Sequence, residues 1–202
     1  MFFKAFLLGL AIAVPLGPIG ALCIQRVLAR GFWAGGAGGL GTALADALYA
    51  SLAGLGFARF SSVLATISTP LGILGGGFLI WLGLRSWPRR APTAAPAPIG
   101  AQGHLGTLAS TFFLTLANPA TILSFAAIFA GLGLAEGAGQ AAIWQVVGGV
   151  FAGSMAWWIL LSGLVARLRH ALGDRFTIWV GRASALLMGG FGIWAVARVF
   201  MQ

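Results

Sequence analysis

Six long apolar stretches, separated by short polar or glycine-rich connections, make up most of this chain. Each stretch is close to the roughly 20 residues that a helix needs to cross a hydrocarbon core of ~30 Å. The stretches lie at about 5–25, 34–57, 66–84, 106–134, 141–165 and 177–199. This pattern predicts an all-α integral membrane protein with six transmembrane helices and no soluble domain.

Proline interrupts two of the apolar stretches near their centres. The first contains Pro15, Gly17 and Pro18, and the fourth contains Asn118 and Pro119. Proline cannot donate a backbone hydrogen bond and clashes with the carbonyl four residues earlier, so each break frees carbonyl groups. In lipid, such groups are tolerated only where protein or a wet cavity surrounds them. The two breaks are therefore the first candidate for a binding site.

The segment 88–104 is rich in Pro, Ala and Gly and has no apolar periodicity, which predicts a linker. It divides a single membrane domain, 1–202, into two halves of three spans, 1–87 and 105–202. Because each half has an odd number of spans, the second half enters the membrane from the opposite side. Since the breaks fall in corresponding spans, we expect two inverted three-helix repeats.

Polar side chains gather on one face of the second span. Thr42, Asp46 and Tyr49 are spaced four and three residues apart, so they share a helix face. A carboxyl at the membrane centre costs roughly 2.5 to 3.5 kcal/mol, and it indicates a functional site by default. The alternative is a structural carboxyl that caps a neighbouring broken helix.

The fourth span carries the most polar run inside any span, with hydroxyl side chains around Asn118 that include Thr115 and Thr121. These groups can bind a cargo molecule. The alternative is that they only satisfy the backbone groups that Pro119 frees. Both readings place polar side chains at the second break.

Local patterns add further expectations about packing and loops. Gly9, Ala13, Gly17 and Ala21 recur every four residues, which predicts a packing stripe on one helix face. Such stripes permit a homodimer without requiring one. A short basic loop is expected over 25–31, and the eight tryptophans are interpreted as interfacial anchors or lipid-facing bulk.

The charge distribution predicts topology. Only 7% of the residues are charged, against roughly 25% in a soluble domain, and the net charge is +9. The loops after spans one, three and five hold nine of the 12 basic residues, and Lys4, Arg59 and Arg198 are on the other side. The nine are Arg26, Arg30, Arg85, Arg89, Arg90, Arg167, Arg169, Arg175 and Arg182. They indicate a cytoplasmic face and contact with lipid headgroups rather than nucleic acid, so both termini should lie outside.

Several kinds of chemistry have no residues to support them. Cys23 is the only cysteine, Lys4 is the only lysine, and His104 and His170 fall in predicted loops. These residues cannot form a Walker A sequence, a metal site, or a catalytic triad inside the membrane, so we expect no enzyme, no cofactor and no metal. The first apolar run resembles a signal peptide up to Ala13, but it continues beyond that point, and we expect it to remain as a span. One buried carboxyl between two broken helices is typical of a secondary transporter.

The residues also resemble a known family. Gly17-Pro18, Arg30-Gly31, the glycine-rich run that ends in Ala45-Asp46-Ala47-Leu48-Tyr49, and Asn118-Pro119 are similar to the LysE/RhtB family of amino-acid exporters. This resemblance covers nearly the whole chain. It implies six helices in the bacterial inner membrane and export of amino acids or related small metabolites, coupled to an ion gradient.

We therefore expect a substrate site near the midplane between spans one and four, with contributions from span two. Asp46 is expected to exchange a proton, which makes proton antiport the preferred mechanism. Two alternatives remain: an exporter of the same fold for a different small molecule, and a non-transporting membrane scaffold or helper subunit. The expected substrate-binding residues are Pro15, Gly17, Pro18, Thr42, Tyr49, Asn118, Pro119 and Thr121.

Overall fold

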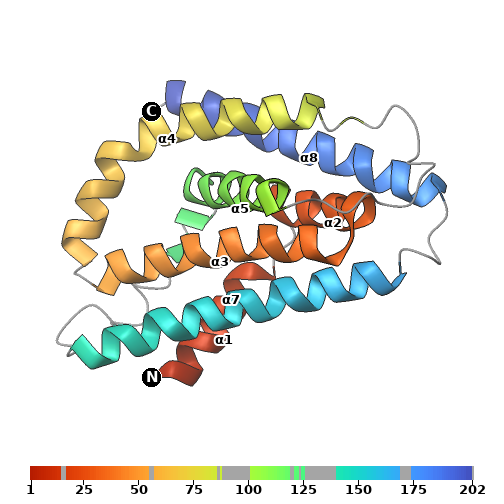
Figure 1. Cartoon of the computed structure of the whole chain (residues 1–202). Coiled ribbons are helices and arrows are strands. Elements are labelled where there is room, and N and C mark those ends of the chain that lie inside the picture. Colours follow the sequence, from red (N-terminus) through yellow and green to blue (C-terminus); the bar gives the residue numbers. More distant parts are fainter. Residues whose placement is uncertain are drawn as a thin grey trace.

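The computed structural model is all-helical over the residues that it describes. These are residues 1–14, 17–54, 57–85, 87, 101–118, 121–122, 124–125, 140–168 and 174–201. The helices, labelled as in Figure 1, are α1 (Phe2–Ala13), α2 (Pro18–Arg30), α3 (Phe32–Gly54), α4 (Phe57–Arg85), α5 (Ala101–Leu116), α7 (Gln140–Leu168) and α8 (Asp174–Phe200). The all-α prediction is confirmed for this part of the chain.

Length and hydropathy identify fewer spans than the six predicted. Among the described residues, Ala141–Leu168 and Ile178–Phe200 are each long and apolar enough to cross a membrane. Phe2–Ala13 and Pro18–Arg30 form a third span if the bent pair is counted as one. The 23-residue α3 is long enough to cross, but its glycines and Asp46 dilute its hydropathy, and the break at Asn118 leaves α5 only 16 residues long. The arrangement of six spans in two repeats stays a prediction.

The first break separates two helices that differ in direction by 79°. The amide of Val14 donates to the carbonyl of Leu10 at the end of α1, and Gly17 precedes the start of α2. Pro18 occupies the first turn of α2, where its missing N–H costs little, so it begins a helix rather than interrupting one. The predicted small-residue stripe is therefore wrong beyond Ala13, because the bend directs the two helices differently.

Helix boundaries correct two further predictions. α2 continues to Arg30, through most of the loop predicted over 25–31. α4 begins at Phe57, so Arg59 lies in a helix rather than a loop. Pro70 is inside this helix. Figure 1 shows α4 bent between its orange first part and its yellow second part, as a proline within a helix favours.

The fifth helix starts inside the predicted linker. α5 begins at Ala101, so the end of the 88–104 segment is helical and His104 is not in a loop. Its first turns contain no proline, and the hydroxyl of Thr107 donates to the carbonyl of Gly103 within the helix. Residues 88–100 lie outside the described part of the chain.

Glycines allow the main helix pairs to approach closely. α1 packs on α7, α3 packs on both α5 and α7, and α4 packs on α8. A Cβ at Gly9 would collide with the backbone of Val150 in α7, and one at Gly41 would collide with the carbonyl of Leu108 in α5. Small residues that bring backbones together are the usual basis of helix association in membranes.

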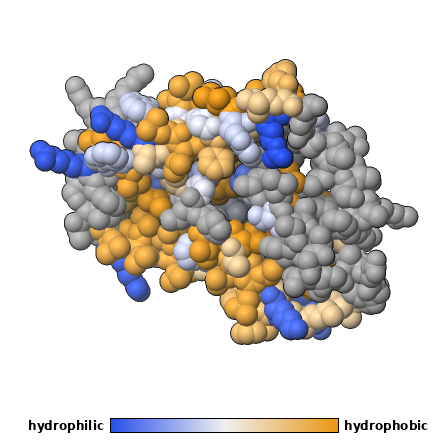
Figure 2. All heavy atoms as spheres, turned by 180° about the vertical axis from the view of Figure 1, so that it is seen from behind, coloured by the Kyte–Doolittle hydropathy of each residue, from blue (hydrophilic) through white to orange (hydrophobic). Residues whose placement is uncertain are grey.

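The outer surface is predominantly apolar. Figure 2 shows hydrophobic residues over most of the visible described surface, with strongly hydrophilic side chains near its margins. Trp144 is 67% exposed and Trp179 is 73% exposed, and large aliphatic side chains such as Leu74 and Leu84 are exposed as well. An apolar surface of this extent is suited to contact with lipid rather than water.

Candidate functional site

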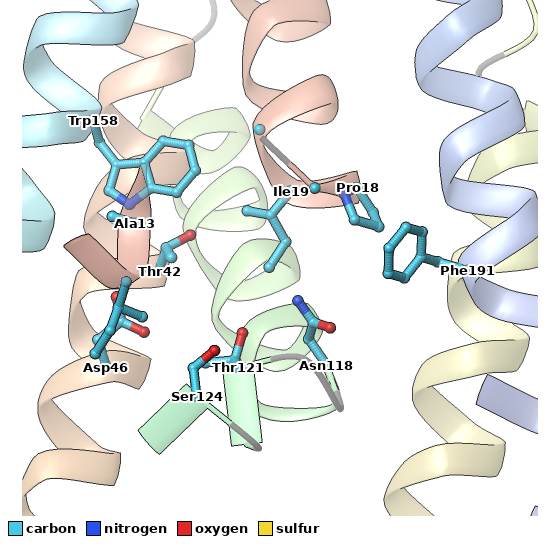
Figure 3. Close-up of a pocket in the computed structure, with 13 residues that line it drawn as sticks. Ala13, Pro18, Ile19, Thr42, Asp46, Asn118, Thr121, Ser124, Trp158 and Phe191 are labelled. Carbon is cyan, nitrogen blue, oxygen red and sulfur yellow. The ribbon is translucent and has the colours of Figure 1, made fainter. Parts of the chain in front are cut away.

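The two helix breaks face one cavity of about 260 Å³. It lies between α1, α2, α3, α7 and α8 and the short segment that follows α5, as Figure 3 shows. Its walls combine polar and apolar side chains, as ligand cavities usually do. The lining residues are Ile12, Ala13, Gly17, Pro18, Ile19, Gly20, Thr42, Asp46, Asn118, Thr121, Ser124, Trp158 and Phe191.

Asp46 is the acidic side chain of this cavity. It is 1% exposed, and its Oδ2 accepts a hydrogen bond of 2.7 Å from the hydroxyl of Ser154 in α7. Within the described part of the chain, its Oδ1 has no hydrogen-bond partner. A buried carboxyl oxygen without a partner is costly, so this atom is ready to accept a donor from a bound molecule or to carry a proton.

The first turn of α2, after the first break, borders the same space. Ile19 and Gly20 line the cavity in the first turn of α2, where amides have no partner within the helix. The positive end of the helix dipole lies at this turn and favours an anionic group. The cavity is therefore lined both by the carboxyl of Asp46 and by a helix N-terminus that favours an anion.

Hydroxyl groups join α5 to α3 beside the cavity. Thr111 donates to the carbonyl of Gly38 at 2.8 Å, and Thr115 donates to the hydroxyl of Thr42 at 3.4 Å. The carbonyl of Thr115 itself accepts the amide of Asn118 at 3.2 Å, although Pro119 was expected to free it. Part of the polarity around the second break therefore joins α5 to α3, a role that differs both from binding a cargo molecule and from satisfying the groups that Pro119 frees.

Tyr49 supports the second break without lining the cavity. Its hydroxyl donates to the carbonyl of Leu116, one of the last carbonyls of α5, and its ring stacks on Phe125 at 5.4 Å between centroids. The last carbonyls of a helix lack partners within it, so a side-chain donor there is stabilising. The substrate-binding role expected for Tyr49 is not supported by its position.

The structure brings most of the other predicted site residues together. Six of them line the cavity: Gly17, Pro18, Thr42, Asp46, Asn118 and Thr121. Figure 3 shows Asn118, Thr121 and Ser124 reaching into it from one side. Pro15 and Pro119 lie outside the described residues.

Sequence reasoning missed the contributions of α7 and α8. Ser154 directly follows Gly153 in α7 and is not among the site residues predicted from the sequence. Trp158, interpreted from sequence as an anchor or as lipid-facing bulk, is 3% exposed and lines the cavity, and Phe191 closes it from α8. The spacing of Ser154 and Trp158, four residues apart on one helix face, was the available signal.

Arg26 is not a loop residue. It lies in α2, partly buried, and donates to the hydroxyl of Ser110 at 2.8 Å and to the carbonyl of Thr107 at 3.3 Å. Both acceptors belong to α5. This arginine therefore links α2, the helix that follows the first break, to α5, the helix that precedes the second break.

These features define a class: a helical membrane protein whose broken helices enclose a small cavity with one buried carboxyl. Residues 10–198 match the LysE type translocator family, and the chain belongs to that family. Its members are transporters, so the expectation of no enzyme is confirmed, as is the resemblance seen in the sequence.

Curated relatives carry transport names at low identity. The chain is 27% identical over 179 residues to "Putative amino acid efflux protein YcgF" of Bacillus subtilis (strain 168), covering 87% of this chain and 85% of the relative. It is 29% identical over 161 residues to "Threonine efflux protein" of Escherichia coli (strain K12), covering 77% and 78%. It is 32% identical over 182 residues to "Uncharacterized membrane protein YahN" of the same strain, covering 88% and 79%. No solved structure matches the chain significantly.

Proposed function

We propose that this protein exports amino acids or related small metabolites from the bacterial cytoplasm through the cavity at the two helix breaks. The observation that carries the proposal is the buried Oδ1 of Asp46, which has no hydrogen-bond partner among the described residues. Asp46 lines a cavity whose other walls are both polar and apolar. Relatives named as amino-acid and threonine efflux proteins support the direction of transport.

We further propose that transport is proton antiport, which the burial of Asp46 in the cavity wall supports. Among the described lining residues it is the one ionisable side chain, so proton and ammonium compete for the same carboxyl. A site that binds either a proton or the cargo, but not both, exchanges one for the other across the membrane. The cargo carboxylate is then placed toward the amides of Ile19 and Gly20 at the start of α2, away from Asp46.

We also propose that the chain is two inverted three-helix repeats in the inner membrane, with both termini outside. The helix contacts support two equivalent halves. The first helix of the first half, α1, packs on α7 of the second half, and the first helix of the second half, α5, packs on α3 of the first half. A Cβ on Gly76 of α4 would approach the carbonyl of Gly192 in α8, and one on Gly192 would approach the carbonyl of Gly76. A reciprocal contact of this kind is expected when two halves are related by a two-fold axis.

The test is counterflow of a panel of labelled amino acids into liposomes that contain the purified protein. Saturable flux is expected, and a pH difference that is acidic on the cargo-receiving side should accelerate it, because protons then move against the cargo. Asp46→Asn should abolish this acceleration while the protein still elutes as the wild type does. Asp46→Glu retains the charge and tests whether the position of the carboxyl also matters.

Two results would contradict the proposal. Gradient-driven transport that survives Asp46→Asn would remove Asp46 from proton coupling. Folded protein that transports no amino acid would instead favour a different small-molecule cargo, and then a scaffold or helper subunit if a wider panel also shows no flux.

A further inference from the structure

Trp158 places a hydrogen-bond donor in the cavity wall that the described residues leave unused. Its side chain is 3% exposed, and its Nε1 has no acceptor within the part of the chain that the structure describes. Figure 3 shows the nitrogen-bearing edge of the indole turned inward, toward Ala13 and Thr42. A buried N–H without an acceptor is unfavourable, so a bound molecule that supplies one gains affinity.

The surrounding helices hold this indole in place. A Cβ at Gly39 of α3 would collide with Cβ and Cγ of Trp158, so the glycine provides the room that the indole occupies. Trp158 lies one helical turn after Ser154, whose hydroxyl binds Oδ2 of Asp46. One face of α7 therefore holds the carboxyl in position and, one helical turn further on, adds a donor to the same cavity.

The unused donor and the unused acceptor call for a ligand with two kinds of group. Oδ1 of Asp46 needs a donor or a cation, and Nε1 of Trp158 needs an acceptor. A carboxylate on the same ligand is repelled by Asp46 and attracted by the N-terminal turn of α2, which also lines this cavity. An amino acid with adjacent ammonium and carboxylate groups fits these requirements.

We propose that Trp158 is a specificity-determining residue whose indole N–H donates a hydrogen bond to the carboxylate of the cargo. This inference rests on the proposed function, because it requires an amino acid in the cavity. It adds that selection for the carboxylate depends on α7 as well as on the broken helices.

The chain offers a matched control in the neighbouring tryptophan. Nε1 of Trp157 is also buried without an acceptor among the described residues, but Trp157 is not one of the residues that line the cavity. Trp158→Phe and Trp157→Phe each remove one indole N–H and retain an aromatic ring. The measurement is the KM of an amino acid in counterflow, together with competition by the amine that lacks its carboxylate.

Trp158→Phe is expected to raise the KM about 10- to 100-fold, the range for losing a hydrogen bond to a charged group, and Trp157→Phe to leave it unchanged. The amine should compete more weakly than the amino acid with the wild type. It should compete equally well with Trp158→Phe and with the wild type, because it has no carboxylate for the indole to bind.

Three outcomes overturn the inference. The first is an unchanged KM in Trp158→Phe while the wild type transports, which leaves the proposed function standing. The second is an equal loss of affinity for amino acid and amine, which shows that the indole acts by packing. The third is a wild type that transports no amino acid, which removes both proposals. If Trp158→Phe does not fold, equal competition by amine and amino acid with the wild type still overturns the inference.

Discussion

The two helix breaks meet at one cavity but are supported differently. At the first break the chain turns through 79°, and the cavity is lined there mainly by apolar side chains and by the first turn of α2. At the second break, Tyr49 binds the last carbonyl of α5, and Asn118, Thr121 and Ser124 line the cavity. The first break thus contributes the N-terminal turn of a helix, whereas the second is reinforced by side chains. A proline break by itself does not determine what a helix end contributes to a site.

The largest expected effects come from the glycines that bring the two broken spans against their neighbours. Gly9→Ala pushes α1 from α7, and Gly41→Ala pushes α3 from α5, since each new Cβ meets backbone. Each variant should lose ~1–3 kcal/mol of stability, the usual cost of overpacking, measured as a fall in thermal unfolding midpoint in detergent. Gly36→Ala is the control, because nothing lies within 4 Å of its Cβ. Equal midpoints for Gly9→Ala and Gly36→Ala would contradict the close packing of α1 on α7.

Removing the side-chain support of the second break is expected to have a smaller effect. Tyr49→Phe leaves the carbonyl of Leu116 without this donor while retaining the aromatic ring. The cost should be about 1–1.5 kcal/mol of stability, the upper range for one hydrogen bond, with little change in the KM of the cargo, because Tyr49 does not line the cavity. A large rise in KM at unchanged stability would instead return Tyr49 to the substrate site.

The smallest loss of stability is expected from removing the hydrogen bonds that Arg26 of α2 donates to α5. Arg26→Leu removes the hydrogen bonds to Ser110 and Thr107 and should cost about 1 kcal/mol, again measured by thermal unfolding. Arg30→Leu is the matched control, since it removes the same charge from an exposed position of the same helix. Similar unfolding midpoints for the two variants would show that the loss of stability comes from removing a charge, not from removing the hydrogen bonds between α2 and α5.

The candidate site was predicted best where local chemistry dominates. The residue before a proline is disfavoured in the helical conformation whatever its neighbours in space, so Gly17, Pro18 and Asn118 could be selected from the sequence alone. Asp46 and Thr42 were found because helical spacing places them on one face. Tyr49 has that same spacing, yet it turns to α5, because the face of a helix contacts more than one neighbour.

Helix ends were predicted less well than helix cores. α4 and α5 both begin earlier than their apolar patterns, at Phe57 and Ala101, because polar residues can continue a helix beyond its apolar part. The number of spans identified by hydropathy is also lower than the number predicted. Glycines reduce the hydropathy of α3, although they promote its packing against other helices.

The sequence by itself determined that the protein is helical and apolar, where two of its helices break, and which carboxyl lies among them. Only the tertiary structure decided which side chains surround that carboxyl. Ser154 is 108 residues from Asp46 along the chain, and Trp158 lies on the same helix face as Ser154. Ser154 reaches Asp46, and Trp158 reaches the cavity, because small residues let α7 pack closely on its neighbours. Such contacts depend on how helices cross, and helix crossing is a property of pairs of helices that no single stretch of sequence contains.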